Sequence, residues 1–180
     1  IDVYQEFHHN GEHEQVEILF EGAQGFGLDV DWGDYPYVTS SHCTVGGAVL
    51  NGVPAHSIRK VYGAAKIYET YVGAKEFGMT EGIEAKVIRE FGEEFGATTG
   101  RPRKIDWFDI DSVSKAIDIN GLTTLVINKV DVLEKVGKFI LYHGEDKFEF
   151  DSIQDMQHYI EEHLKREGME IIFSGHKDKI

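Results

Sequence analysis

The chain has 180 residues, with 18 Lys and Arg against 32 Asp and Glu, and a formal net charge of −14. Its length is typical of one domain with a real core, and 41% hydrophobic content with three prolines excludes a disordered or collagen-like chain. No apolar run approaches the roughly 20 residues that cross a bilayer, and the acidic charge argues against a broad nucleic-acid-binding surface. The single cysteine, Cys43, excludes an internal disulfide and a Cys-based zinc site, which is typical of a cytoplasmic protein.

The first 60 residues predict little regular structure. Residues 1–14 are polar and hold three histidines, which we interpret as a surface segment because neither Cys nor a helical His pair accompanies them. The apolar run at residues 16–20 predicts a buried strand. Residues 21–53 are rich in Gly, Asp, Ser and Thr, and irregular segments of this length are usually functional. The chain opens on Ile1 with no secretory signal, so we expect it to be cut from a longer protein.

The rest of the sequence alternates predicted strands and helices. Residues 61–72 are rich in β-branched and aromatic side chains and predict one strand. Further elements are predicted in this order: a helix at 84–95, a helix from 109–112 to 120–121, a strand at 122–127, a helix at 152–167 and a strand at 169–173. The first of these helices would bury Val87, Ile88, Phe91 and Phe95. The alternation predicts an α/β fold with a largely parallel central sheet and flanking helices, without an internal domain boundary.

An Asn-Lys-x-Asp tetrad, Asn128 to Asp131, follows the predicted strand at 122–127. The Asp131 carboxylate can accept hydrogen bonds from the N1–H and the N2 amino group of guanine, while the stem of Lys129 packs on the purine plane. Open α/β sheets bind ligands at the carboxyl ends of their strands, where this tetrad would lie. The tetrad alone is compatible with a guanine site or with a chance surface turn.

The segment from Gly96 to Lys104 is the main concentration of basic residues in this acidic chain. Its two arginines, Arg101 and Arg103, can form bidentate pairs with carboxylate or phosphate, and two threonines offer hydroxyl groups. The segment therefore suits a small dianion, such as a dicarboxylate or a nucleotide. A solvated charged turn is the alternative interpretation.

Two earlier segments could approach a phosphate. Residues 21–27 hold three glycines, and residues 39–41 are three consecutive hydroxyl side chains, although either could be an ordinary turn. The chain contains no Gly-x-x-x-x-Gly-Lys-Ser/Thr phosphate loop, which argues against a small GTPase. A nucleophile and base at His42 and Cys43 is disfavoured, because neighbours on an extended chain point to opposite sides.

Five segments occur in an order that resembles the adenylosuccinate synthetase family over most of residues 16–135. They are Glu21-Gly-Ala-Gln-Gly, Tyr35-Pro-Tyr-Val-Thr-Ser-Ser, Tyr71-Val-Gly-Ala, Glu94-Phe-Gly-Ala-Thr-Thr-Gly-Arg-Pro-Arg and Asn128-Lys-Val-Asp. The closing Ile171-Ile-Phe-Ser-Gly is similar to the family's C-terminal strand and base-contacting turn. The resemblance implies a P-loop-NTPase-like α/β architecture and a carbon–nitrogen ligase. Such a ligase phosphorylates the 6-oxygen of a 6-oxopurine nucleotide with a nucleoside triphosphate, and the amine of L-aspartate then displaces the phosphate.

The resemblance also implies a role for each matching residue. Gln24 would be catalytic, because its contact with the 6-oxygen steadies the charge that develops there. The purine nucleotide would be bound by Gln24, Gly25, Thr39, Val72 and Gly73, the aspartate by Thr98, Thr99, Arg101 and Arg103, and the donor nucleotide by Arg103, Asn128, Lys129, Asp131, Ser174 and Gly175.

The family's glycine-rich phosphate loop, general-base Asp, catalytic His and Mg²⁺ ligands belong to an N-terminal part that this sequence does not contain. We therefore expect residues 1–180 to be the C-terminal part of a single adenylosuccinate synthetase-like domain, with no metal ligand of their own. Alone, they should bind weakly and catalyse nothing, and the N-terminal half would be their partner. The resemblance further implies a homodimer.

Several residues depart from the usual family pattern. Tyr71 stands where Arg is usual, Lys75 begins a segment that replaces Gly-Pro-Phe-Pro, and His42 replaces Asn. With a short C-terminal region, the pattern most resembles the phage-encoded 2-aminoadenylosuccinate synthetase branch, which uses dGMP with ATP or dATP and would act in the host cytoplasm. The alternatives are an ordinary synthetase that uses IMP and GTP, and a nucleotide-binding module without catalysis. Asp131 favours guanine as the base of the donor nucleotide, whereas the phage branch uses ATP or dATP. The sequence therefore leaves the choice among ATP, dATP and GTP open.

Overall fold

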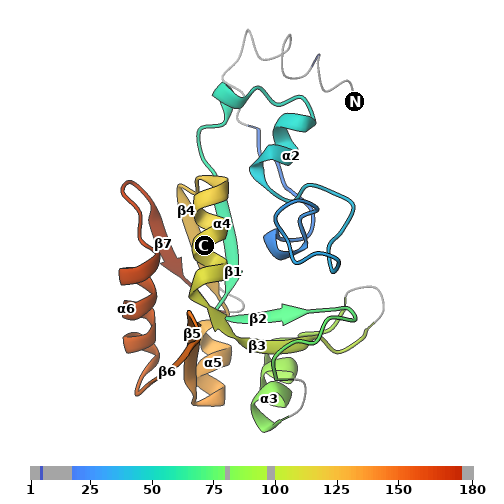
Figure 1. The fold of residues 1–180 in the computed structure, drawn as a ribbon. Coiled ribbons are helices and arrows are strands. Elements are labelled where there is room, and N and C mark those ends of the chain that lie inside the picture. Colours follow the sequence, from blue (N-terminus) through green and yellow to red (C-terminus); the bar gives the residue numbers. More distant parts are fainter. Residues whose placement is uncertain (1–4, 6–17, 80–81, 97–99, 176–180) are drawn as a thin grey trace. The chain divides into compact units, whose positions relative to one another are not determined.

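The computed structural model describes residues 5, 18–79, 82–96 and 100–175. The chain divides into two compact units, residues 1–61 and 62–180, and each is described by itself (Figure 1). Among the described residues, no helix is both long and apolar enough to cross a membrane.

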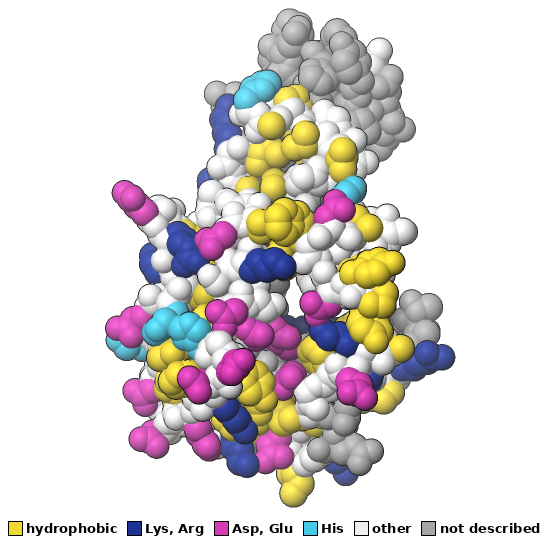
Figure 2. All heavy atoms as spheres, in the orientation of Figure 1, with side chains coloured by type: hydrophobic (Ala, Val, Ile, Leu, Met, Phe, Trp, Pro, Cys, Tyr) yellow, Lys and Arg dark blue, Asp and Glu magenta, His cyan; other side chains and the backbone are white. Residues whose placement is uncertain are grey.

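The described part of the first unit is mostly irregular. Its short helical elements are η2 (Phe26–Leu28), α2 (Val45–Leu50) and η3 (Ala55–Ser57). The strand predicted at residues 16–20 is wrong for residues 18–20, which form no strand, and Leu19 is 86% exposed; residues 16 and 17 lie outside the described residues. An apolar run becomes a strand only when a partner pairs with its backbone, and none pairs with these residues in the described part of the chain. Several large apolar side chains lie on the surface of this unit (Figure 2).

One sheet of the second unit is entirely parallel. Its order is β1 (Tyr62–Lys66), β4 (Thr124–Asn128) and β7 (Glu170–Phe173). Parallel pairing places the carboxyl ends of all three strands at the same edge, with Lys66 opposite Asn128. The predicted α/β fold with a parallel sheet and flanking helices is thereby confirmed, as are the strands predicted at 122–127 and 169–173.

The second sheet is mixed. It contains β2 (Tyr68–Tyr71), β3 (Lys104–Asp109), β5 (Phe139–His143) and β6 (Asp146–Phe150), with antiparallel β2–β3 and β5–β6 pairs and a parallel β3–β5 pair. The single strand predicted at 61–72 is therefore wrong, because the chain passes from the parallel to the mixed sheet at Ile67. A run of strand-forming residues does not encode where such a change occurs, since the change depends on distant partners.

In the described part of the second unit, four helices flank these sheets: α3 (Ile83–Phe91), α4 (Ile110–Asn120), α5 (Val130–Val136) and α6 (Ile153–Leu164). The predicted α4 and α6 are confirmed, and their caps explain them. Asp109 accepts a hydrogen bond from Ser112 N at 3.0 Å, and Ser152 Oγ accepts one from Asp155 N at 3.1 Å. Helix α4 ends at Gly121, whose φ of +59° is the left-handed conformation that glycine allows.

Helix α3 is shorter than predicted. It ends at Phe91, so that Phe91 and Phe95 are 54% and 44% exposed rather than buried. The buried face consists of Ala85 and Ile88. Gly92 ends the helix, and a Cβ at this position would overlap Tyr68 Oη and the carbonyl oxygen of Ile88. The close approach of Gly92 to Tyr68 is important for the site described below.

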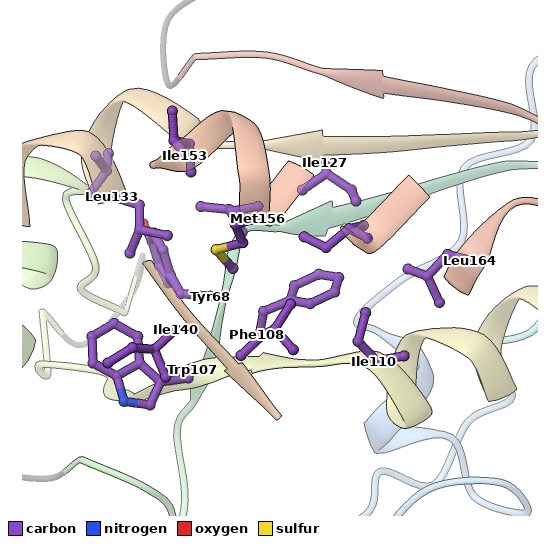
Figure 3. Packing of buried hydrophobic residues seen from close by; sticks show 14 of the residues in the cluster. Tyr68, Trp107, Phe108, Ile110, Ile127, Leu133, Ile140, Ile153, Met156 and Leu164 are labelled. Atoms are coloured by element: carbon purple, nitrogen blue, oxygen red, sulfur yellow. The ribbon is translucent and has the colours of Figure 1, made fainter. Parts of the chain in front are cut away.

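One hydrophobic core joins the two sheets of the second unit. It includes Ile127 from the parallel sheet, Phe108 from the mixed sheet and Met156 from α6, all at most 1% exposed (Figure 3). Burying each such side chain contributes roughly 1.5–3 kcal/mol. The shared core fixes the ends of β1, β2 and β4 relative to one another, and these strand ends carry the candidate site.

Candidate functional site

A pocket of about 220 Å³ lies where β4 and β7 end and α5 begins. It is lined by Val130, Asp131, Glu134, Gln157, Phe173, Ser174 and Gly175. Ser174 N donates to Ile127 O at 3.0 Å, and Val130 N donates to Ser174 O at 3.1 Å, so parallel pairing continues beyond the strand ends. This pairing brings Asp131 together with Ser174 and Gly175, three of the residues predicted to bind the donor nucleotide. Glu134 and Gln157 also line the pocket, but no sequence pattern singled them out.

The other two residues of the tetrad have different surroundings. Lys129 adopts a left-handed φ of +64° at the N-cap of α5. Its Nζ donates to Glu94 Oε1 at 2.9 Å and to the carbonyl oxygen of Gly92. The Oδ1 atom of Asn128 is buried and has no hydrogen-bond partner among the described residues. The tetrad is thus divided: Asp131 lines the pocket, and the ammonium group of Lys129 is held by Glu94.

Glu94 is the centre of a buried polar group, which we name the Glu94 cluster: Glu94, Lys66, Tyr68, Arg103 and Lys129. The Glu94 side chain is 1% exposed. Its Oε2 accepts hydrogen bonds from Lys66 Nζ at 2.7 Å and Arg103 Nη1 at 3.1 Å. Its Oε1 accepts from Lys129 Nζ at 2.9 Å and Tyr68 Oη at 2.8 Å. Three basic side chains therefore surround one carboxylate in a chain whose net charge is −14.

The protonation states within the Glu94 cluster follow from burial and from these contacts. Burial by itself would raise the pKa of Glu94, but hydrogen bonds from Lys66 and Lys129 hold that pKa below its ordinary value. Burial raises the pKa of Tyr68 strongly, and the negative charge of Glu94 adds to this effect. Burial also lowers the pKa of Lys66, with a further contribution from the nearby charges of Arg103 and Lys129. Glu94 is consequently an acceptor and Tyr68 a donor at neutral pH.

The basic segment leaves the sheet through a stem that includes Glu94. Arg103 N donates to Glu94 O at 3.0 Å, and Gly96 N donates to Arg101 O at 2.8 Å. Arg89 Nε of α3 donates to Arg103 O at 2.7 Å. Arg101 is exposed, whereas Thr98 and Thr99 lie outside the described residues. Glu94 and Lys66 were not predicted as site residues, because only the fold brings an acidic residue at position 94 to four donors from three other segments.

Two predicted residues of the first unit are brought together. Gln24 Oε1 accepts a hydrogen bond from Ser41 Oγ at 2.9 Å, and Ser41 Oγ lies 3.4 Å from Thr39 Oγ1. Gly25 precedes η2, and its carbonyl oxygen accepts from Leu28 N at 2.9 Å. The polar groups of Gln24 and Thr39 therefore form one continuous chain of hydrogen-bonding atoms. In the second unit, Val72 is 49% exposed and Gly73 follows it with a φ of +157°.

A buried carboxylate holds this part of the first unit in place. Asp29 is fully buried, and its oxygens accept hydrogen bonds from Asp31 N at 2.9 Å, Trp32 N at 3.0 Å and Cys43 N at 2.6 Å. Burial acts to raise the pKa of Asp29, but these backbone donors lower it below the ordinary value. Asp29 thus ties the segment after η2 to the segment that follows Ser41.

Replacing Asp29 with Ala should loosen both segments, because three backbone N–H groups would lose their acceptor. We expect the free energy of local unfolding of these two segments to fall by about 3 kcal/mol. In native-state hydrogen exchange, the amides of Asp31 and Cys43 should exchange about a hundredfold faster. Glu21→Ala, which removes an exposed carboxylate from the same unit, should leave these rates unchanged. Equal exchange rates in the two variants would contradict the role given to Asp29.

Asp29, Asp31 and His42 place ligand atoms within 4.8 Å of one another. They do not fit Mg²⁺, which takes near-octahedral oxygen ligands, because the Asp29 oxygens already accept backbone hydrogen bonds. His42 Nδ1 instead lies 3.2 Å from Asp31 Oδ2. The described residues thus give no support to a Mg²⁺ site.

Comparison with known proteins identifies the family. The family model described as adenylosuccinate synthetase matches residues 1–144. The chain belongs to the adenylosuccinate synthetase family. The adenylosuccinate synthetase of Deinococcus radiodurans is 43% identical over 138 residues, which cover 73% of this chain and 34% of that protein. The chain therefore spans about a third of the length of this relative.

A solved structure of the family agrees with this fold. The fully ligated adenylosuccinate synthetase of Plasmodium falciparum matches with a TM-score of 0.73 and 28% identity, over 86% of this chain and 46% of that one. The succinoaminodeoxyadenylate synthetase (PurZ) of cyanophage S-2L, solved with dGMP and dATP, matches with a TM-score of 0.49 and 21% identity, over 79% of this chain and 49% of that one. The second match is too distant to bear on the choice of substrate. Adenylosuccinate synthetases are carbon–nitrogen ligases that act in purine biosynthesis.

Proposed function

We propose that this chain is part of a ligase that joins L-aspartate to the 6-position of a 6-oxopurine nucleotide at the expense of a nucleoside triphosphate. The supporting observation is the pocket beyond β4 and β7, where Asp131, Ser174 and Gly175 come together from segments 43 residues apart in the sequence. In this proposal the pocket receives the base of the triphosphate. Arg101 and Arg103, with Thr98 and Thr99, bind the carboxylates of aspartate, and Gln24, Gly25 and Thr39 of the first unit bind the acceptor nucleotide.

The chemistry of the pocket favours GTP over ATP or dATP as the donor. Guanine presents an N1–H and an amino group on one edge, and both can donate to the Asp131 carboxylate. Adenine presents an unprotonated N1 on the corresponding edge, which would face the lone pairs of a carboxylate. Mg²⁺ would accompany the triphosphate, with ligands from other parts of the enzyme.

The acceptor nucleotide in this proposal is IMP. Support comes from the name of the Deinococcus relative, adenylosuccinate synthetase, at 43% identity. The second candidate is dGMP, the acceptor of the phage branch. It is supported by the departures of this sequence from the usual family pattern at His42, Tyr71 and Lys75. A homodimer of the complete enzyme, located in the cytoplasm, is part of the same proposal.

Aspartate-dependent ligation by the complete enzyme that contains this chain tests the proposal. IMP and dGMP should each be offered with GTP, ATP or dATP, and the product separated by chromatography. We expect turnover of IMP with GTP, whereas turnover of dGMP alone would establish the second candidate. The 180-residue chain by itself should give no turnover, since it spans about a third of its relative's length. Absence of aspartate-dependent product from the complete enzyme with every pair of nucleotides would refute the ligase proposal.

A further inference from the structure

The carboxylate of Glu94 bridges two segments for which different ligands are proposed. Its Oε1 holds Lys129, two residues before Asp131 on the pocket wall. Its Oε2 holds Arg103, in the stem of the basic segment. The backbone of Glu94 also pairs with Arg103, through the bond from Arg103 N to Glu94 O at 3.0 Å. One rigid, planar group therefore contacts the donor-base side and the aspartate side at once.

Stability alone is a weak explanation for such an arrangement. Burying a carboxylate with several cations costs desolvation free energy that their attraction often only offsets, and well-packed apolar residues are frequently as stable. Here one carboxylate faces three basic groups, so the Glu94 cluster is not even balanced in charge. All four donors reach it with good geometry, between 2.7 and 3.1 Å. Both oxygens of the Glu94 carboxylate are satisfied, whereas Arg103 Nε is buried without a hydrogen-bond partner among the described residues. Four hydrogen bonds to one carboxylate restrict its orientation, and a network that leaves a buried donor unpaired is poorly explained by stability alone.

We propose that Glu94 is a positioning residue that couples the donor-nucleotide pocket to the aspartate-binding segment. A base bound against Asp131 orders the start of α5 and thereby Lys129. Lys129 fixes the plane of the Glu94 carboxylate, and the second oxygen of that carboxylate then fixes Arg103. The inference rests on the proposed function, because that function assigns a different ligand to each segment. Coupling of this kind is reciprocal, so each ligand tightens the binding of the other by the same factor.

The experiment measures this factor in the complete enzyme. The dissociation constant of GTP is measured by calorimetry with and without saturating succinate, a dicarboxylate that resembles aspartate but lacks the reacting amine. For the wild type we expect succinate to tighten GTP binding about tenfold. Glu94→Gln should reduce this factor to less than about twofold, and Glu94→Asp should restore part of it. The ratio of the two GTP dissociation constants is informative, because a general loss of structure would weaken the binding of both GTP and succinate without abolishing the effect of one on the other.

A compensated variant separates coupling from stability. Glu94→Gln combined with Lys66→Met removes the carboxylate and one cation, and so keeps the same excess of basic over acidic groups in the Glu94 cluster. Lys66 lies at the end of β1 and belongs to neither proposed ligand segment. Tyr68→Phe retains the carboxylate and removes one donor from Oε1, which should weaken the coupling only in part.

The outcomes are distinct. The inference is supported if the variant with Glu94→Gln and Lys66→Met still binds GTP and succinate no longer tightens that binding. A factor of ten that persists without the carboxylate overturns it, as does a wild-type enzyme in which succinate leaves the GTP affinity unchanged. An enzyme that forms no product with aspartate from any pair of nucleotides refutes the proposed function instead.

Discussion

Replacing Asp131 with Asn should weaken GTP binding by the complete enzyme about a hundredfold. The Asp131 carboxylate, which lines the pocket, would accept two hydrogen bonds from guanine, and a hydrogen bond to a charged group contributes about 1.5–3 kcal/mol. An amide keeps one acceptor but turns an N–H₂ group toward the N2 amino group of guanine. A loss of about 3 kcal/mol corresponds to roughly two orders of magnitude in affinity.

The same change should improve binding of xanthosine triphosphate. Xanthine has a carbonyl oxygen where guanine has its amino group, so the Asn amide can donate to it while still accepting from N1–H. Titration of both nucleotides into wild-type and variant enzyme measures the exchange of preference directly. Glu134→Gln makes the same carboxylate-to-amide change on the same helix and pocket wall, and should alter GTP affinity less than threefold. If Glu134→Gln, and not Asp131→Asn, changed the preference between guanosine and xanthosine triphosphate, the guanine base would contact Glu134 and not Asp131.

The sequence predicted helices accurately where residues next to each helix end form the cap. Helices α4 and α6 begin at Asp109 and Ser152, whose side chains accept from backbone N–H groups three residues later, and α4 ends at Gly121. These interactions lie within a few residues of one another, so a sequence pattern contains them in full. Helix α3 ends instead where Glu93 adopts a left-handed φ of +55° and Glu94 N donates to Arg89 O at 2.9 Å, and the prediction missed this end because a glutamate is no helix-stop signal.

The strands show the same limit. No short pattern marks Ile67 as the point where the chain leaves one sheet for another, because β1 pairs with β4 and β2 pairs with β3, both distant in sequence. Within the candidate site, the resemblance of motifs selected Asp131 and Ser174, which parallel pairing brings to one pocket. It did not select Glu94 as a site residue, since three of its four donors lie 26 to 35 residues away and only the folded chain assembles them.

Replacing Glu94 with Gln should lower the free energy of unfolding of the second unit by about 3–5 kcal/mol at pH 7. The substitution leaves Lys66, Arg103 and Lys129 close together without a counter-charge, and removal of one partner from a buried ion pair has a cost of this size. Urea denaturation of the chain followed by circular dichroism measures the difference. Glu90→Gln, which removes an exposed carboxylate of α3, should change the free energy by less than 0.5 kcal/mol, roughly the range of ordinary surface substitutions.

The pH dependence of the free energy of unfolding tests the role of the Glu94 charge independently. Burial opposes the charge on Glu94, yet the hydrogen bonds from Lys66 and Lys129 hold its pKa in the folded protein below the ordinary value of 4.5. A carboxylate with a depressed pKa stabilises the fold above 4.5, and its contribution disappears as the pH falls through the folded-state pKa. The wild-type advantage over Glu94→Gln should therefore be full at pH 7 and shrink steadily below pH 4.5. An advantage that stays constant down to pH 2 would mean that side-chain packing, and not the charge of Glu94, holds the cluster together.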